Sequence, residues 1–360
     1  MIKQAKAPES LVGQVGREAT RTIDRSRRSL DVLLGRHDPD VGITPKDTLY
    51  AKGTMKLYRF RPVTDDVYRV PLVFVMSLVS KAYILDLAPG QSFVEYLLKQ
   101  GFDVYMIDWG YPRAEDHTLR LDDYVMDMMP RCLEIVREKT GQDDVSLLGY
   151  CMGGVFGLMY GGAFPESGVK NLICVATPVD FDGMGLLRRW VDPRWFDVDQ
   201  LVDTYGNIPA ELISRSLEML RPLERPMSYL RLWDNLWDEE YVYNWRIRYK
   251  WVQDQIPFPG EAYRQFTKEL MWGNKLIKGE LELGGTRIDL KRISGSVLNA
   301  VAEFDHISPY DATKSLTSYV GSEDKQDLTV RGGHVSLIAG RSAVTRLWPT
   351  VNEWLSARSL

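Results

Sequence analysis

The sequence has few of the residues from which disulfide frameworks and metal sites are built. Its 360 residues include three cysteines, Cys132, Cys151 and Cys174, and only four histidines. No two cysteines form a CxxC pair, and their spacing to the histidines fits no zinc motif. We therefore expect neither a disulfide framework nor a metal site, and we expect no cofactor.

The sequence also lacks long apolar runs and any excess of positive charge. No stretch approaches the roughly 18 consecutive apolar residues of a membrane-spanning helix, and the opening MIKQAKAPESLVGQVGREATR has no apolar core of a secretory signal. The net charge is −4, which argues against a nucleic-acid partner. We expect a cytoplasmic globular protein.

Residues 1–40 are predicted to form an amphipathic helical segment. Between Glu9 and Arg36 the apolar residues recur at roughly helical spacing, and arginines fill the other faces. Such a helix either docks on its own core with solvated arginines or binds a partner or a surface. The pattern alone leaves both interpretations open.

The rest of the chain alternates short apolar, β-rich runs with helical segments. Strand character is found at 55–60, 71–79, 103–108, 145–150, 171–177, 296–304 and 326–330, and helical spacing at 92–101, 121–140 and the C-terminal end. Pro130 is expected to kink its helix, and Thr44-Pro45 has the form of a helix start. This alternation is typical of an α/β fold with a mostly parallel sheet.

The alternation breaks between 178 and 291, where proline, charged and aromatic residues crowd together without clear strands. Seven of the ten tryptophans lie there. They either fill the core of a helical insertion or line a cap over an apolar substrate channel, and the two are compatible. We therefore divide the core into 41–177 and 292–360, with 178–291 as an inserted, mainly helical cap.

The segment Gly149-Tyr150-Cys151-Met152-Gly153-Gly154 has the form of a nucleophile elbow. It lies where the strand at 145–150 turns into a helical stretch, and it has cysteine where serine is usual. A helix N-terminus also favours a thiolate. A small cysteine packed between glycines is the alternative interpretation.

Two further residues complete a candidate catalytic set. Asp305 follows the strand at 296–304, and His334 follows the strand at 326–330. Nucleophile, acid and histidine in this order, each at the end of a strand, is the arrangement of α/β-hydrolases. We predict that His334 is the base for Cys151, with Asp305 beside it.

Other residues are weaker candidates. His306 adjoins Asp305 and is either a hydrogen-bond donor behind it or a surface residue, with the role of base as a competing assignment. His37 and His117 are interpreted as solvated loop residues. Cys132 and Cys174 lie in apolar surroundings that favour core packing.

An oxyanion hole is expected from backbone N–H groups. The first candidate is the N–H of Met152, and the second is that of Val79, in the loop around 77–80. No HGGG motif supports the second position.

A cysteine nucleophile indicates a thioester substrate. Exchange between a thiol and a thioester is nearly isoenergetic and keeps the acyl group activated, whereas attack on an oxyester must expel a poorer leaving group. The residues themselves indicate acyl transfer. They leave open a synthase, a thioesterase and a small ester or lactone hydrolase.

Several motifs in a fixed order resemble the catalytic subunit of polyhydroxyalkanoate synthases over nearly the whole chain. They read VGITPKDTLYAKGTMKLYRF, AYILDLAPGQSFVEYLLKQGFDVYMIDWG, LLGYCMGG, TYGNIPAE, IPFPGEAYRQF, NKLIKGEL, DHISP and GGH. The likeness is greatest to the short class IV type, with class III next. It implies an α/β-hydrolase core with an inserted cap.

The resemblance also implies a function. The chain would be an acyltransferase that polymerises short-chain (R)-3-hydroxyacyl-CoA into polyhydroxybutyrate-like polyester at a granule surface. CoA would be released from the substrate thioester and would not serve as a cofactor. A small accessory subunit is implied, in a homodimer or hetero-oligomer, and the N-terminal segment is a candidate contact for it.

Carried over by residue, the family's nucleophile falls on Cys151, its acid on Asp305 and its histidine on His334. The family further suggests that Asp305 helps to activate the 3-hydroxyl of the incoming unit. Ser80 stands where relatives commonly carry asparagine, so the residues of this loop that form the oxyanion hole stay unassigned by the resemblance. A thioesterase and a non-catalytic granule-coating protein with a degenerate hydrolase fold are the competing functions.

Overall fold

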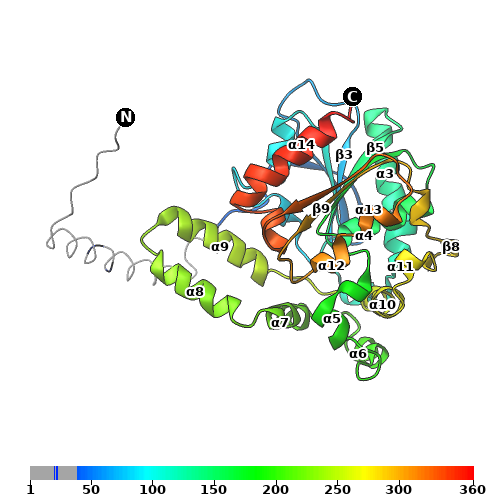
Figure 1. Cartoon of the computed structure of the whole chain (residues 1–360). Coiled ribbons are helices and arrows are strands. Elements are labelled where there is room, and N and C mark those ends of the chain that lie inside the picture. Colours follow the sequence, from blue (N-terminus) through cyan, green and yellow to red (C-terminus); the bar gives the residue numbers. More distant parts are fainter. Residues whose placement is uncertain (1–19, 21, 23–38) are drawn as a thin grey trace. The chain divides into compact units, whose positions relative to one another are not determined.

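The computed structural model describes residues 20, 22 and 39–360. Its centre is an eight-stranded sheet in the order β1-β2-β4-β3-β5-β6-β9-β10 (Figure 1). The strands are β1 (Lys46–Lys52), β2 (Met55–Phe60), β3 (Leu72–Val75), β4 (Val104–Asp108), β5 (Val145–Tyr150), β6 (Val169–Val175), β9 (Ser296–Ala302) and β10 (Lys325–Val330). The α/β fold predicted from the alternating pattern is confirmed.

The six strands from β4 to β10 run parallel, and β1 and β2 extend the sheet antiparallel at one edge. The apolar run of β3 is buried throughout, as expected for an inner strand with both faces covered. A strand, and not a helix, follows Thr44-Pro45. The Thr44 hydroxyl donates to Asp86 Oδ1 at 2.5 Å, so it does not cap a helix.

Helices pack against the sheet, and Figure 1 shows α14 and α3 on opposite sides of the strands. Around the sheet lie α2 (Phe93–Lys99), α3 (Met129–Thr140), α4 (Met152–Ala163), α12 (Tyr310–Thr313), α13 (Leu316–Tyr319) and α14 (Trp348–Ser356). Shorter helical turns are η1 (Ala82–Leu85), η2 (Ala114–Thr118), η4 (Phe181–Gly183), η6 (Leu290–Arg292), η7 (His334–Leu337) and η8 (Ala343–Leu347). Every residue of α4 is buried, so this helix lies at the centre of the core.

The predicted helix at 121–140 is two segments. A π-helical stretch, η3 (Asp123–Met128), leads directly into α3, and Pro130 lies in the first turn of α3. Proline is tolerated there because the N–H groups of a first turn have no partner within their own helix.

Between 178 and 291 the structure is mainly helical. It contains α5 (Gly185–Trp190), α6 (Val198–Tyr205), α7 (Ala210–Leu220), α8 (Glu224–Asp234), α9 (Glu239–Gln253), α10 (Gly260–Gln265), η5 (Phe266–Trp272) and α11 (Lys275–Lys278). The expectation that strands are absent is wrong in one place. A short antiparallel pair joins β7 (Glu282–Leu283) to β8 (Thr286–Arg287).

The chain divides into two compact units. The larger comprises 41–220 and 253–360, and residues 221–252 belong to the smaller. In the smaller unit α8 and α9 bury a cluster of Leu232, Leu236, Val242 and Trp245. The limits 178 and 291 of the proposed cap stay a prediction.

The predicted N-terminal helix, 1–40, lies almost entirely outside the described residues. Among the residues that the structure does describe, no helix is both long and apolar enough to cross a membrane.

Candidate active site

Cys151 lies in a strained turn between β5 and α4. Its backbone has φ 54° and ψ −121°, a conformation that residues other than glycine rarely adopt. Its N–H donates a hydrogen bond to the Val175 carbonyl at 2.8 Å. Such strain persists only where the surroundings enforce it, and it is common at catalytic residues. The elbow predicted from the motif has this geometry.

The neighbouring glycines are required by close backbone contacts. A Cβ on Gly153 would lie 1.9 Å from the Val75 carbonyl oxygen, and one on Gly149 would lie 2.3 Å from Gly154 Cα. The helix can therefore start directly behind the sulfur only because side chains are absent at these positions.

Asp305 and His334 form a buried pair. His334 Nδ1 and Asp305 Oδ2 are 2.7 Å apart, with Nδ1 as the natural donor. The loops that carry them are hydrogen-bonded to each other, since Glu303 N–H donates to the Val330 carbonyl and Phe304 N–H donates to the Gly332 carbonyl. Both follow parallel strands at the edge where β5 ends in Cys151, so the sheet brings the three predicted residues together.

His334 is prepared to carry a proton. Burial of the ring disfavours the charged form, but Asp305 and then Cys151 outweigh it and raise the pKa of His334 from 6.5 to about 10. Cys151 adds to the rise in the pKa of His334 through its charge and through a side-chain hydrogen bond. The raised pKa means that the imidazole of His334 holds its proton at neutral pH and can act as a proton donor in acyl transfer.

The expected oxyanion donors differ in their environment. Met152 is the first residue of α4, so its N–H has no acceptor within its own helix and points to the turn that holds Cys151. The N–H of Val79 instead donates to Ser77 Oγ at 3.4 Å, a long bond that an incoming oxyanion would have to replace. Both assignments stay predictions.

Of the weaker candidates, His37 lies outside the residues that the structure describes. His117 is exposed, with Nδ1 2.9 Å from the Ala114 carbonyl. Cys132 and Cys174 are fully buried, and burial raises the pKa of each thiol to about 12. His306 is half-buried beside Asp305, and its role behind the acid stays a prediction.

Two residues near the sulfur were missed by the sequence interpretation. The ring of Tyr150 lies 4.9 Å from that of His334, and Ser308 Oγ lies 3.8 Å from Cys151 Sγ. Tyr150 could have been noted as the residue before the nucleophile. Nothing in the sequence indicates that Ser308 contacts Cys151 in the fold.

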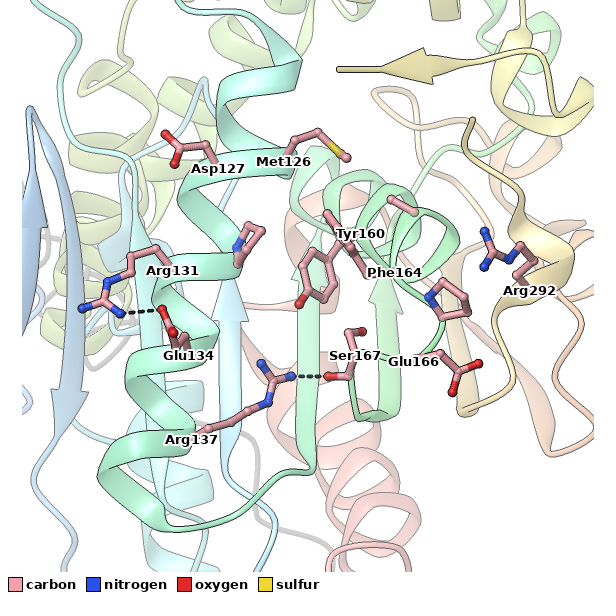
Figure 2. A pocket seen from close by; sticks show the side chains of 13 residues that line it. Met126, Asp127, Arg131, Glu134, Arg137, Tyr160, Phe164, Glu166, Ser167 and Arg292 are labelled. Carbon is pink, nitrogen blue, oxygen red and sulfur yellow. Dashed lines mark hydrogen bonds and ion pairs between the residues drawn. The ribbon is translucent and has the colours of Figure 1, made fainter. Parts of the chain in front are cut away.

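A separate groove of about 770 Å³ opens between α3 and the end of α4 (Figure 2). Its charges pair locally, as in the hydrogen bonds of Arg131 to Glu134 and of Arg137 to the Ser167 carbonyl. It is lined by none of the predicted catalytic residues. We therefore place the chemistry at Cys151 and not in this groove.

Comparisons with known families match two parts of the chain. A model of the alpha/beta hydrolase fold matches residues 84–340, and a model of the poly-beta-hydroxybutyrate polymerase (PhaC) N-terminus matches residues 29–97. The first match includes all three predicted catalytic residues, and together the two span most of the sequence.

Three similar proteins carry the name poly(3-hydroxyalkanoate) polymerase subunit PhaC. The protein from Allochromatium vinosum is 38% identical, over 93% of this chain and 96% of its own length. That from Haloferax mediterranei is 38% identical, over 95% and 70%, and that from Synechocystis is 36% identical, over 96% and 95%. These likenesses extend over nearly the whole chain.

Solved structures share the fold at low sequence identity. A candidate lipase from Sulfolobus solfataricus superposes with a TM-score of 0.58 at 16% identity, covering 89% of this chain and 97% of that one. A thermophilic esterase from Thermogutta terrifontis gives 0.50 at 17% identity, covering 87% and 97%. At this identity the likeness shows the α/β-hydrolase fold alone.

Proposed function

The chain belongs to the poly(3-hydroxyalkanoate) polymerase family within the α/β-hydrolase fold, and on that premise we propose that it polymerises short-chain (R)-3-hydroxyacyl-CoA through an acyl intermediate on Cys151. The observation that supports the chemistry most directly is the buried pair of His334 and Asp305 at 2.7 Å, beside a strained cysteine at the head of α4. A thiol, a base and an orienting carboxylate are the components of nucleophilic acyl transfer.

The first half-reaction loads the enzyme. The Cys151 sulfur attacks the carbonyl carbon of the thioester, and a C–S bond to the enzyme forms while the C–S bond to CoA breaks. The departing CoA thiolate takes the proton held by His334, whose raised pKa keeps that proton available at neutral pH. The acyl group stays activated because a thioester has been exchanged for a thioester.

The second half-reaction builds the ester. The 3-hydroxyl of the next unit attacks the acyl carbon on Cys151, and His334 takes the hydroxyl proton as the C–O bond forms and the C–S bond breaks. The product is a CoA thioester that is longer by one unit, and it can acylate Cys151 again. Repetition of the two steps yields a polyester with one CoA released for each unit.

Asp305 serves this cycle through His334. Its side chain is 1% exposed, and its two oxygens accept hydrogen bonds from His334 Nδ1 and from the backbone N–H groups of Ile307 and Ser308. A carboxylate so enclosed orients the imidazole and stabilises its charged form. We propose that its help to the 3-hydroxyl is given in this indirect way.

The remaining assignments extend the family premise. We propose that the enzyme acts with a small accessory subunit, as a homodimer or hetero-oligomer, on the surface of the growing polyester granule in the cytoplasm. The reaction as written needs no cofactor, because the thioester supplies the activated acyl group and CoA leaves as product.

The proposal is tested by release of CoA from (R)-3-hydroxybutyryl-CoA with and without a candidate accessory subunit, while turbidity is followed. We expect CoA release with rising turbidity, and loss of both in Cys151→Ala. Cys174→Ala is the matched control, since that thiol is buried in β6. Stoichiometric CoA release with soluble hydroxybutyrate and no polymer would make the chain a thioesterase and overturn the proposal.

A further inference from the structure

Ser308 faces the catalytic sulfur from a distant part of the chain. It lies in the loop after β9, 157 residues beyond Cys151, yet its Oγ is 3.8 Å from Cys151 Sγ. Ser308 is 1% exposed, so its hydroxyl is turned into the protein. A contact between a buried hydroxyl and a nucleophilic sulfur places a second polar group at the reacting atom.

The loop that carries Ser308 is fixed by the carboxylate that orients the base. Asp305 Oδ1 accepts hydrogen bonds from the N–H groups of Ile307 at 2.8 Å and Ser308 at 2.9 Å, while Oδ2 faces His334. Pro309 follows at the start of α12 and restricts the chain on the other side. Asp305 therefore positions two groups at the sulfur, the imidazole and the serine hydroxyl.

A hydroxyl in this position has a definite effect on a sulfur that changes charge. Either atom of the pair can donate when the sulfur is a thiol, but a thiolate can only accept, so the Ser308 O–H then donates to it. Hydrogen bonds to a charged acceptor are about twice as strong as neutral ones and gain further in a buried site. A length of 3.8 Å is long, and catalytic hydrogen bonds commonly shorten as charge develops.

We propose that Ser308 is a further catalytic residue, whose hydroxyl donates a hydrogen bond to the Cys151 sulfur whenever that sulfur carries negative charge. The charge is present when the thiolate attacks the substrate, and it develops again when the sulfur leaves the acyl group. Ser308 therefore assists both half-reactions. The second effect rests on the proposed polymerase function, and the first does not.

Thiol alkylation tests the proposal without substrate. Cys151 is half-buried while Cys132 and Cys174 are buried, so iodoacetamide reports on Cys151 once the rate of Cys151→Ala is subtracted. In Ser308→Ala we expect alkylation at neutral pH to be about tenfold slower and the midpoint of the pH–rate profile to rise by about one unit, as for loss of a hydrogen bond to a charged group. Ser322→Ala is the matched control, a buried serine bonded to the Asp324 carbonyl, and it should leave the profile unchanged.

A second pair of variants, Ser308→Thr and Ser308→Val, tests the proposal even if Ser308→Ala perturbs the loop after β9. Threonine and valine add the same bulk at position 308 and differ in whether a hydroxyl is present. We expect Ser308→Thr to react faster than Ser308→Val and to have the lower pH midpoint. Equal profiles for this pair, or a Ser308→Ala profile equal to that of the unchanged chain, would overturn the proposal and leave Ser308 as a packing residue.

The turnover measurement separates this inference from the proposed function. CoA release and polymer formation should fall about tenfold in Ser308→Ala and recover in part in Ser308→Thr. If the unchanged chain makes no polymer but the alkylation profiles differ as expected, the polymerase proposal fails and the role of Ser308 at the sulfur stands. If polymer forms and the profiles are equal, the role of Ser308 fails alone.

Discussion

At the scale of single residues, the site depends on one carboxylate with several partners. Asp305 Oδ2 faces His334, and Oδ1 accepts the N–H groups of Ile307 and Ser308. An asparagine cannot reproduce this pattern, because its NH₂ group would face either the imidazole or two backbone N–H donors. A neutral amide would also remove the charge that raises the pKa of His334.

We therefore expect Asp305→Asn to slow both half-reactions, by about 10³- to 10⁴-fold as in other triads with this change. Acylation is measured as the burst of CoA in a single turnover, and elongation as polymer formed in the steady state. Asp327→Asn is the control, since that carboxylate bonds Asn299 and Thr317 on β9 and α13. A burst of unchanged rate with elongation lost would show instead that Asp305 acts directly on the incoming hydroxyl.

Much of the residue-level arrangement could be predicted from the sequence. The order of Cys151, Asp305 and His334, each after a β-rich run, was sufficient because parallel strands deliver their C-terminal ends to one edge. Ser308 could not be predicted, because its contact depends on the path of a loop that the Asp305 side chain fixes. Val79 was predicted as an oxyanion donor, but the hydrogen bond from its N–H to Ser77 Oγ could not be predicted, because it depends on the geometry of that loop.

At the scale of elements, the elbow is held by close packing of α4 against β3. Gly153 lies so near the Val75 carbonyl oxygen that any Cβ would displace backbone, which cannot yield as a flexible side chain can. Because α4 is buried along its whole length, a shift of its first turn would be felt throughout the core.

We expect Gly153→Ala to lower the thermal midpoint by several degrees or to prevent soluble expression. Gly161→Ala on the same helix is the control, because its added Cβ would meet only the Ile293 side chain, at 3.2 Å, and should cost little. Circular dichroism melts of the two variants compare them directly. A Gly153→Ala protein with an unchanged melt and normal alkylation of Cys151 would contradict the packing argument.

The sequence predicted the buried elements better than the edges. The inner strands β3, β5 and β6 were recognised because each contains a run of buried and mainly apolar residues, as expected where both faces of a sheet are covered. β1 was missed, since its sequence KDTLYAK is polar and half-exposed at the sheet edge. The strands β7 and β8 have two residues each, so they are too short to show an alternating pattern in the sequence.

At the scale of the whole molecule, composition indicated the unusual region but not its organisation. The tryptophans between 178 and 291 were interpreted either as core residues or as the lining of a cap. In the structure some of them are buried and others are exposed. Trp245 and Trp251 are buried, while Trp195, Trp233 and Trp237 are exposed. Within the region 178–291, residues 221–252 belong to the smaller unit. This boundary depends on contacts between residues distant in sequence, which hydrophobic periodicity cannot reveal.

The C-terminal helix α14 packs against the core of the larger unit. We expect it to contribute to the stability of the fold more than to catalytic activity. Trp348 of α14 is 1% exposed and stacks on Phe93 of α2, with ring centroids 5.2 Å apart. Its Nε1 finds no hydrogen-bond partner among the described residues, so its ring and not its N–H supplies the stabilisation. The two catalytic loops follow β9 and β10 and lie outside this ring cluster.

We expect Trp348→Ala to reduce the free energy of unfolding by about 3–5 kcal/mol, as for other large aromatic side chains removed from a core. Trp348→Phe should cost less, because it keeps a ring against Phe93 and deletes an unpaired buried N–H. Trp233→Ala, at an exposed position in the smaller unit, should cost under about 1 kcal/mol. Urea titrations rank the three. CoA release below the unfolding transition should persist in Trp348→Ala, and its loss there would mean that α14 positions the catalytic loops as well as closing the core.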